Sequence, residues 1–506
     1  MLDTQVARTD VRPVAVPRVP RASVPWLLGA LGAVFGFTGS WIPSYWGDEA
    51  ASVMSAERSW SSLTGLLGNI DAVHGVYYAL LHVWVGAFGA TELATRLPSA
   101  IAVGLMVAGT VFLVREFAVP RVAVIAGVVA IVLPRTTSMA TETRSYAMGA
   151  AAAVWLTVLL VRLLRRRAGR GGWAGYAVAA AACMYLFLYL GLILLVHGLY
   201  VAIVYRDRVR AWLGSCAAAL VLALPIIMLG YRQRSQIAFL ARRDYTTLHN
   251  VLVSQWFGTT LVAVVGWLLI AAAVVAFVVA AARRGVSLPP AQRLAGLALA
   301  WLALPTTILL TGNAALSPMY NVRYLSFCVP AAAILIALGA EILGARLARP
   351  AQHVLPIALI AVLVIACLPV YTSQHTPWAK DGGSDWRAVA AYVSANATTG
   401  DAVLFDQTTK PSRDPRIMLS LYPSDFAGLR DVALAVPYAE RTHLWDAVIS
   451  NADAVAADRT LTSVWAMELP AAAGQPTDIT MLLHHGFTLD TAQRINRTTV
   501  YHLTKE

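Results

Sequence analysis

The chain has 506 residues, of which 58% are hydrophobic and only 13% are charged, and its mean hydropathy is +0.63. Soluble globular chains carry about a quarter charged residues, so this composition excludes an ordinary water-soluble protein. The net charge of +12 does not indicate nucleic-acid binding, because the basic residues gather in short loops between apolar runs, which is the pattern of membrane topology.

The N-terminal segment, residues 1–24, is rich in Pro and Val and carries four arginines, which are Arg8, Arg12, Arg18 and Arg21. We expect this segment to be disordered and cytoplasmic. The apolar run after it lacks a convincing small-residue cleavage site, which indicates a retained first helix rather than a signal peptide. This helix is predicted over about residues 25–44 and places Trp46 at the outer face.

Basic loops mark the cytoplasmic side of a membrane protein, and four Arg-rich segments separate the later apolar runs, at residues 162–170, 206–210, 283–284 and 346–349. Placing all four on one side predicts eleven spans within residues 25–372, near 25–44, 97–115, 122–133, 146–164, 173–189, 190–205, 211–230, 261–282, 294–311, 323–345 and 353–371. The apolar stretch 74–89 is shorter and flanked by Asp71 and Glu92, so we expect it to lie in the interface within the first outer loop.

Residues 375–506 differ from the rest of the chain, because they are rich in Asp, Glu, Thr and Asn and hold no run long enough to span a membrane. The pattern predicts an amphipathic helix over 385–396 and strands over 402–405, 479–483 and 498–503. We therefore expect a small soluble α/β domain, which the count of spans places on the extracytoplasmic side.

The four cysteines, Cys183, Cys216, Cys328 and Cys367, lie inside apolar runs, and none has a neighbour at metal-ligand spacing. They are expected to be packing residues rather than disulfide partners or metal ligands. Their spacing therefore indicates no zinc site. The chain also lacks a glycine-rich phosphate loop, so no P-loop nucleotide site is indicated.

Two adjacent carboxylates, Asp48 and Glu49, follow the first predicted span directly. Like charges this close repel one another, so one of the two could act as a base at the membrane surface. Equally, both could form a solvated acidic cap at the start of an interfacial helix, where the helix dipole favours negative charge. The spacing alone does not decide between a base and a cap.

A second outer loop, predicted over 134–144, places Glu142 and Arg144 at the mouth of the helix that begins near Tyr146. These charges could pair with each other as ordinary loop residues, or they could face the same pocket as Asp48. Arg323, followed by Tyr324, starts a later span from the outside. An Arg at that depth costs about 2–3 kcal/mol unless it snorkels to the interface or meets an anion.

The loop after residue 230 carries five basic groups, which are Arg232, Arg234, Arg242, Arg243 and His249. Basic residues on an outer loop run against the positive-inside bias, so lipid headgroups or a polyprenyl phosphate could bind there. His74, which opens the interfacial stretch, is a better candidate for a site residue than His82 or His197, because the last two lie on apolar faces. The unusual charges thus gather on one face of the membrane. A proton-coupled transporter would need them near the middle of spans, which disfavours that class.

Several of these segments together resemble the GT-C glycosyltransferases, in particular the branch that contains the bacterial protein-mannosyltransferase-like enzymes and the lipid A aminoarabinose transferase. The resemblance covers about residues 25–371, and its motifs are Asp48-Glu49 after the first helix, the aromatic segment from His74 to Trp84, the stretch 93–98, Glu142-Thr143-Arg144-Ser145-Tyr146, and Arg323-Tyr324-Leu325 with Pro330. The opening of the C-terminal domain, Asp385-Trp386-Arg387, is similar to outer domains in such proteins. One departure is that the His-Pro-Pro common in the branch reads His74-Gly75-Val76 here.

The resemblance implies an all-α polytopic membrane protein of GT-C type that performs an inverting sugar transfer. Asp48 would take the proton of an acceptor hydroxyl. The phosphate of a polyprenyl-phosphate donor would leave toward basic residues, for which the candidates are Arg144, Arg323, Arg232, Arg234, Arg242 and Arg243. Contacts to donor or acceptor are expected from Glu49, His74, Glu142, Arg144, Tyr146, His249, Arg323 and Tyr324.

No cofactor is expected to be obligatory, although a divalent cation could bind at Asp48 and Glu49. The Ala, Val and Arg usage suggests a high-GC bacterium of actinobacterial type, so mannose is the expected sugar and arabinose the second choice. The expected acceptor is a hydroxyl of a cell-envelope glycolipid, polysaccharide or protein outside the plasma membrane. Two alternatives are a transporter of lipid-linked glycans and a non-catalytic scaffold of the envelope.

Overall fold

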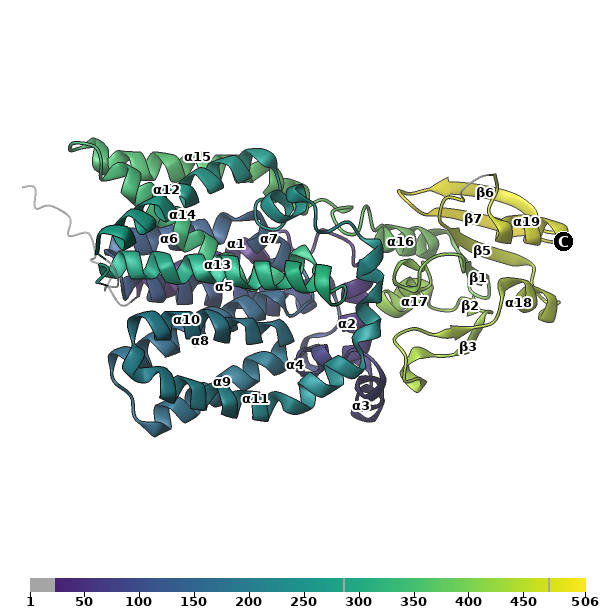
Figure 1. The fold of residues 1–506 in the computed structure, drawn as a ribbon. Helices are drawn as coiled ribbons and strands as arrows, with labels where there is room; N and C mark the ends of the chain where they lie inside the picture. Colours follow the sequence, from purple (N-terminus) through teal and green to yellow (C-terminus); the bar gives the residue numbers. More distant parts are fainter. Residues whose placement is uncertain (1–22, 285–286, 472–473) are drawn as a thin grey trace, which may run out of the picture.

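The computed structural model describes residues 23–284, 287–471 and 474–506, and the N-terminal segment expected to be disordered lies almost wholly outside these residues. A bundle of long helices carries a small α/β domain at one end (Figure 1). Short helices lie between the two parts.

A helix occupies the position of each predicted span: α1 (Val24–Phe37), α5 (Glu92–Arg115), α6 (Pro120–Val132), α8 (Tyr146–Arg165), α9 (Arg170–Leu186), α10 (Leu192–Val204), α11 (Val209–Arg232), α12 (Thr260–Arg284), α13 (Pro290–Ala315), α14 (Val329–Gly344) and α15 (Ala351–Gln374). Within the described residues, seven helices are long and apolar enough to cross a membrane, or eight if the bent pair α6 and α7 (Pro134–Ala140) is one span. The chain is therefore a multi-pass membrane protein of the expected fold class. The count of eleven stays a prediction, because α1, α9 and α10 have only 14, 17 and 13 residues.

Three local predictions are corrected. The first helix ends at Phe37 rather than near residue 44, because Thr38 is extended and Gly39 adopts a left-handed φ of 78°. The second outer loop, predicted over 134–144, begins with helix α7, since Pro134 at its start has the φ that a first helical turn needs. The long loop after α11 contains a 3₁₀ segment, Arg234–Arg242, and a single π-helical turn, Asn250–Ser254.

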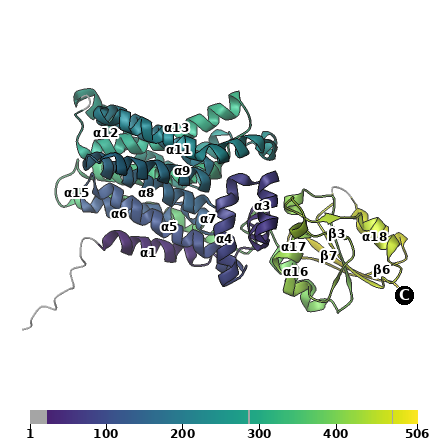
Figure 2. The same cartoon turned by 90° about the horizontal axis from the view of Figure 1, so that it is seen from below.

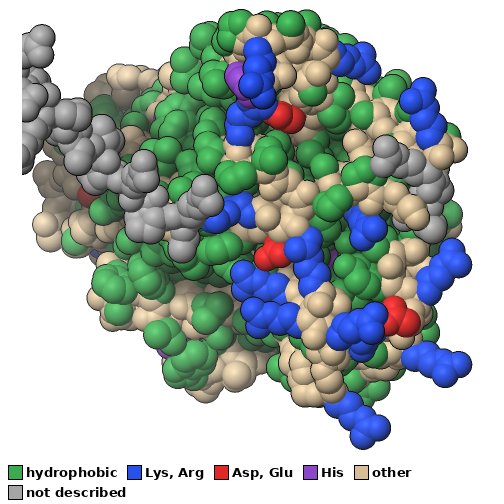
Figure 3. Space-filling view, turned by 90° about the vertical axis from the view of Figure 1, so that its left-hand side faces the viewer, with side chains coloured by type: hydrophobic (Ala, Val, Ile, Leu, Met, Phe, Trp, Pro, Cys, Tyr) green, Lys and Arg blue, Asp and Glu red, His purple; other side chains and the backbone are tan. Residues whose placement is uncertain are grey.

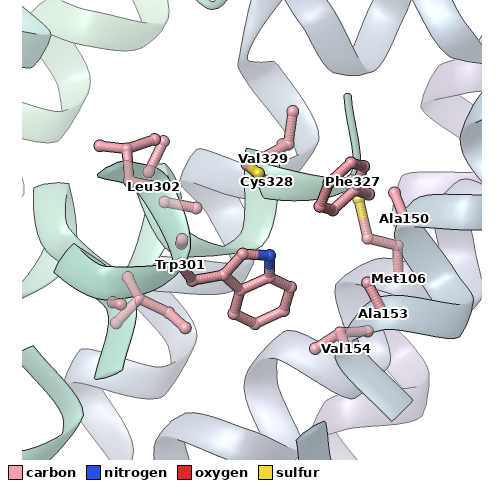
Figure 4. Packing of buried hydrophobic residues seen from close by; sticks show 14 of the residues in the cluster. Met106, Ala150, Ala153, Val154, Trp301, Leu302, Phe327, Cys328 and Val329 are labelled. Carbon is pink, nitrogen blue, oxygen red and sulfur yellow. The ribbon is translucent and has the colours of Figure 1, made fainter. Parts of the chain in front are cut away.

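Small residues let the helices of the bundle approach closely. A Cβ atom on Gly29 of α1 would lie 2.8 Å from the carbonyl oxygen of Gly104 on α5, so only glycine fits at this crossing. In the bundle the fully buried Trp301 of α13 packs among other buried hydrophobic side chains (Figure 4), which include Met106, Ala150, Ala153, Val154, Leu302, Phe327, Cys328 and Val329. All four cysteines are buried and unpaired, which confirms their predicted role in packing.

The end of the bundle that faces away from the α/β domain is strongly basic. Figure 3 shows this end, where Lys and Arg side chains greatly outnumber Asp and Glu. The connections that follow α8, α10 and α14 lie here, and each carries arginines, while α12 ends here with Arg283 and Arg284. Because cytoplasmic loops of membrane proteins are enriched in Lys and Arg, this end is expected to face the cytoplasm.

That orientation can be tested with single cysteines in a chain that lacks the four native ones. Cysteines at Trp60, Ala315 and Glu440 are expected to react with a membrane-impermeant thiol reagent in intact cells. Cysteines at Arg167 and Arg346 are expected to react only after the cells are opened. All five side chains are exposed, so silence reports the side of the membrane rather than burial. The reverse pattern would invert the topology.

The end of the bundle next to the α/β domain is called the outer end below. Three short helices cover it, α2 (Gly47–Glu57), α3 (Trp60–Asn69) and α4 (Gly75–Phe88). Figure 2 shows α3 and α4 between the bundle and the α/β domain. Helix α4 has 14 residues, and its place in the interface rather than across the membrane stays a prediction.

The α/β domain has a five-stranded sheet in the order β2-β1-β5-β7-β6, in which β1 runs parallel to β2 and β5, and β7 runs antiparallel to β5 and β6. A separate hairpin pairs β3 with β4. The elements are α16 (Trp386–Asn396), β1 (Ala402–Phe405), α17 (Ile417–Leu421), β2 (Arg430–Asp431), β3 (Leu434–Val436), β4 (Ala447–Val448), α18 (Asn451–Ala457), β5 (Ser463–Glu468), α19 (Thr477–His484), β6 (Thr488–Arg494) and β7 (Thr499–Thr504).

The predicted helix 385–396 and the strands 402–405 and 498–503 correspond to α16, β1 and β7. The predicted strand 479–483 is wrong, because these residues form helix α19. The buried side chains there are Ile479 and Leu482, three residues apart, which is the period of a helix and not of a strand.

Helix α2 belongs to the core of the α/β domain as much as to the membrane part. Its Val53 and Met54 lie in one hydrophobic cluster with Trp386, Phe405 and Met418 of the domain. Polar contacts reinforce this seam. Arg387 of α16 pairs with Glu92 of α5 at 2.6 Å. The domain is thus fixed to the outer end of the bundle through the same helix that carries Asp48 and Glu49.

Candidate functional site

Asp48 and Glu49 occupy the first turn of α2, which begins at Gly47 and is separated by residues 38–46 from the end of α1 at Phe37. The positive end of the helix dipole stabilises negative charge there, as the cap interpretation expects. Neighbouring residues on a helix point in different directions, however, and the two carboxylates have different partners. Asp48 faces a cavity, whereas Glu49 is fully buried and does not line it.

The cavity has a volume of about 670 Å³ and lies where the outer end of the bundle meets the α/β domain. Most of the residues predicted for the site line it, namely Asp48, His74, Arg144, Tyr146, Arg234, Arg242, Arg243, Arg323 and Tyr324. Four do not, and these are Glu49, Glu142, Arg232 and His249. Segments far apart in the sequence are therefore brought to one place.

An ion pair between Asp48 and Arg323 lies in the cavity. The guanidinium Nη1 of Arg323 is 2.9 Å from Oδ2 of Asp48, and the guanidinium also lies over the Trp46 ring, 4.7 Å from its centroid. Of the two sequence interpretations of Arg323, snorkelling or an anion, the structure supports the anion. The Asp48 side chain keeps a third of its surface exposed to the cavity, so it remains accessible to a ligand.

Arg144 connects α2 to the segment before α4. Its Nη1 donates to the backbone oxygen of Asp48 and to the hydroxyl of Ser52, both at 3.2 Å, and its Nη2 lies 3.0 Å from Nε2 of His74. Because a guanidinium can only donate, Nε2 of His74 must accept and the imidazole is neutral. Burial and the positive charge of Arg144 both hold the pKa of His74 well below its usual value. Arg144 does not pair with Glu142, which excludes the loop-pair interpretation.

Glu49 is held by Arg96 from α5 in a pair of hydrogen bonds, at 2.8 Å from Nε and 2.6 Å from Nη2, with both side chains fully buried. The same carboxylate accepts the backbone N–H of Thr143 at 2.8 Å. Glu49 thereby fastens the loop that carries Arg144 to α2. Sequence analysis did not single out Arg96, although an Arg near the outer end of an apolar helix was the signal that identified Arg323.

Glu142 has a buried partner from the chain segment that enters the α/β domain. Nζ of Lys380 is 3.6 Å from Oε1 of Glu142 and donates to the hydroxyl of Thr141 at 3.0 Å. The two side chains are 9% and 6% exposed, so the pair is a structural tie rather than part of the cavity wall. No pattern in the sequence indicated Lys380, because nothing local relates residue 380 to residue 142.

A second carboxylate of the cavity, Asp71, was not predicted as a site residue. Its Oδ2 accepts from the Tyr78 hydroxyl at 2.8 Å, and its backbone adopts a left-handed φ of 60°. The side-chain oxygens of Gln236 and Gln233 hold the N–H groups of Asp71 and Ala72, at 3.0 and 2.9 Å. Burial raises the pKa of Asp71, although Arg144 opposes the effect. Non-glycine residues in this conformation store strain and are enriched at functional sites.

The remaining walls are basic and apolar. Arg234, Arg242 and Arg243 of the segment after α11 form an exposed rim. The α/β domain supplies a further wall that sequence analysis missed entirely, made of Asp381, Lys410, Pro411, Ser412, Arg413, Leu444 and Trp445. Of the two histidines expected to be packed, His197 is fully buried and bonded to Thr157 and Tyr176.

The Asp48 and Glu49 carboxylates, expected as a possible site for a divalent cation, have different partners in the structure. Glu49 directs both oxygens at Arg96, while Asp48 faces Arg323. Among the residues that the structure describes, no group of three or more His, Cys, Asp or Glu side chains is placed to hold a metal ion.

No family model and no curated protein matches this chain. Solved structures are similar to it. ArnT from Cupriavidus metallidurans in the apo state gives a TM-score of 0.58 at 13% identity over 95% of this chain and 98% of that one. The same protein bound to undecaprenyl phosphate gives 0.57 at 13% identity over 94% and 97%. AglB, an oligosaccharyltransferase from Archaeoglobus fulgidus, gives 0.47 at 11% identity over 88% and 69%. The full-length likeness to ArnT shows the fold, and the chain has the GT-C fold.

Proposed function

We propose that this protein is an inverting glycosyltransferase, which moves a sugar from a polyprenyl-phosphate donor to a hydroxyl of a cell-envelope molecule. The observation that carries the proposal is the accessible Asp48 carboxylate, held by Arg323 inside a large cavity at the outer end of the bundle. The GT-C fold supports it, and the similar ArnT structure was solved with undecaprenyl phosphate bound.

The charge of the cavity suits a phosphate-bearing ligand. Three carboxylates line it, those of Asp48, Asp71 and Asp381, against seven Lys and Arg side chains, which are Arg144, Arg234, Arg242, Arg243, Arg323, Lys410 and Arg413. His74 adds no charge while it accepts from Arg144. A surplus of cations in a concave site concentrates anions and stabilises the charge that develops on a leaving phosphate.

The proposed reaction is a single displacement at the anomeric carbon of the sugar. The acceptor oxygen attacks the anomeric carbon from the face opposite the phosphate, and its proton passes to the Asp48 carboxylate. The bond from that carbon to the phosphate oxygen breaks, and its electron pair stays on the phosphate. As Asp48 becomes neutral, the negative charge near Arg323 moves from the carboxylate to the phosphate. The forked guanidinium of Arg323 can serve both partners in turn.

The other residues of the site have positioning roles in this proposal. Arg144, which donates to the backbone oxygen of Asp48 and contacts His74, holds the first turn of α2 in place. The rings of Tyr146 and Tyr324 line the cavity beside Arg323. The apolar wall between the bundle and the rim suits the first isoprene units of a donor, and its side chains are Phe187, Leu188, Tyr189, Ile237 and Phe239. Arg232 and His249, which lie outside the cavity lining, are proposed only as contacts for lipid headgroups.

Mannose is the proposed sugar and arabinose the second choice, on the composition of the chain and the usual donors of actinobacterial envelopes. The basic end of the bundle supports a site on the extracytoplasmic face of a bacterial plasma membrane. No metal is required for the charges described.

The proposal is tested with purified full-length protein, radiolabelled polyprenyl-phosphate mannose or arabinose, and a crude envelope extract as acceptor. Time-dependent transfer of label to the extract from one of these donors is expected. A glycan transporter or an envelope scaffold would leave the donor intact. Absence of transfer and of donor consumption with both sugars would therefore reject the glycosyltransferase in favour of those alternatives.

Replacement of Arg323 by Ala is expected to lower transfer at subsaturating donor by about ten- to a hundredfold, equivalent to about 1.4–2.8 kcal/mol. The reason is the loss of a forked cation at the leaving phosphate. Arg323→Lys is expected to restore activity only in part, because an ammonium lacks the two parallel donors. Arg121→Ala, at the basic end of α6, is the matched control. An unchanged rate for Arg323→Ala would assign the phosphate to the rim of Arg234, Arg242 and Arg243.

A further inference from the structure

The cavity has two walls of different origin. Asp48, Arg144 and Arg323, which form the charged centre, all belong to the membrane part of the chain. The facing wall belongs to the α/β domain and consists of Asp381, the turn Lys410 to Arg413, and the pair Leu444 and Trp445. The donor phosphate was assigned above to Arg323 in the first wall. The second wall adds the charges of Lys410 and Arg413 to the cavity, but no ligand group has been assigned to it.

The second wall packs directly against Gly47, the residue that precedes Asp48. A Cβ atom on Gly47 would lie 2.1 Å from the carbonyl oxygen of Ser412, so the backbone of the turn rests on the first residue of α2. Arg413 within this turn is held by Asp381 at 2.8 Å. A ligand that reaches Asp48 from the side of the α/β domain must therefore pass along this turn.

The loop that carries Trp445 is fixed by a buried cation. Arg58, at the end of α2, is 1% exposed and donates to the backbone oxygens of Arg441 and His443. Arg441 in turn donates to the backbone oxygen of Trp445 at 2.7 Å. The side-chain amide of Asn69 in α3 donates to the backbone oxygen of Thr442, which lies between Arg441 and His443 in the chain, at 2.9 Å. A loop of the α/β domain is thus anchored to the membrane part by its backbone, and its Trp445 lines the cavity.

The chemistry of this wall suits a sugar ring. An indole and the neighbouring Leu444 offer an apolar surface, while Lys410 and the Asp381–Arg413 pair offer charged hydrogen-bonding groups beside it. A pyranose or furanose has the same division, with C–H groups on its faces and hydroxyls around its edge. A hydrocarbon chain would leave the charged groups unmatched, at a cost when they are desolvated.

We propose that the wall formed by Lys410, Ser412, Arg413, Leu444 and Trp445 is the acceptor-binding surface of this protein. It binds a carbohydrate acceptor, whose ring packs on Trp445 and whose reacting hydroxyl is directed to Asp48. This inference rests on the proposed function for the reaction, but the surface itself is a separate claim. The α/β domain selects the acceptor, and the membrane part holds the donor.

The first experiment separates acceptor binding from donor binding in the purified full-length protein. Trp445→Ala is expected to raise the concentration of envelope extract that gives half-maximal transfer by about tenfold, as the loss of one stacking contact of about 1.4 kcal/mol would do. The affinity for undecaprenyl phosphate, measured in the same preparations, is expected to stay within about twofold. An unchanged dependence on extract, or an equal loss of donor affinity, overturns the proposal.

A pair of glycine variants tests whether the close packing of the turn at Ser412 against Gly47 matters for use of the acceptor. Gly47→Ala is expected to displace Ser412 and to weaken use of the extract more than binding of undecaprenyl phosphate. Gly68→Ala in α3 is the control, because nothing lies within 4 Å of a Cβ atom there. Thermal unfolding of each preparation excludes a loss of folded protein. Equal behaviour of the two variants would count against a turn that guides the acceptor.

The second experiment does not depend on catalysis, so it separates failure of this surface from failure of the proposed function. A photoreactive amino acid replaces Trp445 in the full chain in living cells, and Leu434, an exposed residue of β3, serves as the control position. After illumination, mass spectrometry of the modified peptide is expected to find hexose or pentose at position 445 and none at 434. No carbohydrate adduct at 445, equal adducts at both positions, or an adduct with a polyprenyl chain overturns the proposal.

Discussion

Replacement of Asp48 by Asn is expected to lower turnover by about 10²–10⁴, the range for loss of a general base, while donor binding and insertion stay close to those of the parent. The amide keeps the shape of the carboxylate but cannot take a proton. The side chain is a third exposed to the cavity and is bonded to Arg323, so its removal empties no packed core. The measurement is transfer by purified monodisperse protein at saturating donor and acceptor.

The cap interpretation of Asp48 forecasts a different result. Loss of a favourable charge in the first turn of α2 would lower the melting temperature, and activity would fall only in proportion to folded protein. Asp244→Asn, on the exposed outer loop after α11, is the control for removal of one negative charge. If Asp48→Asn retains more than about a tenth of parental turnover, Asp48 is not the base.

Replacement of Glu49 by Gln is expected to destabilise the protein by about 3–5 kcal/mol, because it leaves the Arg96 guanidinium buried without its counter-charge. The amide oxygen can still accept the Thr143 N–H, but the NH2 group of Gln cannot accept from Nη2 of Arg96 as Oε2 of the carboxylate does. The effect is measured as the shift of thermal unfolding in one detergent. Any loss of activity is expected to follow the loss of folded protein rather than to exceed it.

Two further variants make the result specific to the buried pair. Glu49→Gln combined with Arg96→Met removes both charges and is expected to recover part of the lost stability. Glu116→Gln breaks a pair with Arg165 that is about a third exposed and is expected to cost less than about 1 kcal/mol. If the double variant is no more stable than Glu49→Gln alone, the buried charge is not the cause.

Much of the fold could be predicted because a membrane imposes simple rules. Long apolar runs and Arg-rich turns identified the bundle helices and the basic end without any knowledge of packing. The residues that gather in the cavity were predicted for a related reason. Asp48, Arg144 and Arg323 all lie at the outer boundary, where charge on an apolar helix is costly unless it has a partner or a ligand.

What the sequence could not reveal is the set of long-range contacts. Glu49 was expected to touch substrate, but its neighbour in space is Arg96. Lys380 and Trp445 reach the outer end of the bundle only because the α/β domain folds against α2, and no local pattern records that docking. The helix at Ile479 was mistaken for a strand, since a short apolar run has no clear period until its buried side chains are known.

The packing of the C-terminal domain against helix α2 also couples the domain to the position of Asp48. Helix α2 presents Asp48 on one face and packs Val53 and Met54 into the core of the domain on the other. Any displacement of the domain would therefore move the first turn of α2. Lys380 adds a second tie through Glu142 to the loop that carries Arg144. The orientation of the charged centre thus depends on the α/β domain even where its side chains do not line the cavity.

In the proposed reaction the bond between the sugar and the polyprenyl phosphate is broken in this cavity with Asp48 as the base. Phosphorus NMR reports that bond directly, because the donor is a phosphodiester and the product is a phosphomonoester. With polyprenyl-phosphate mannose or arabinose and envelope extract, the parent protein is expected to convert the diester signal into the monoester signal while Asp48→Asn leaves it almost unchanged. A diester signal that persists with the parent, or that decays equally with both proteins, would contradict the account.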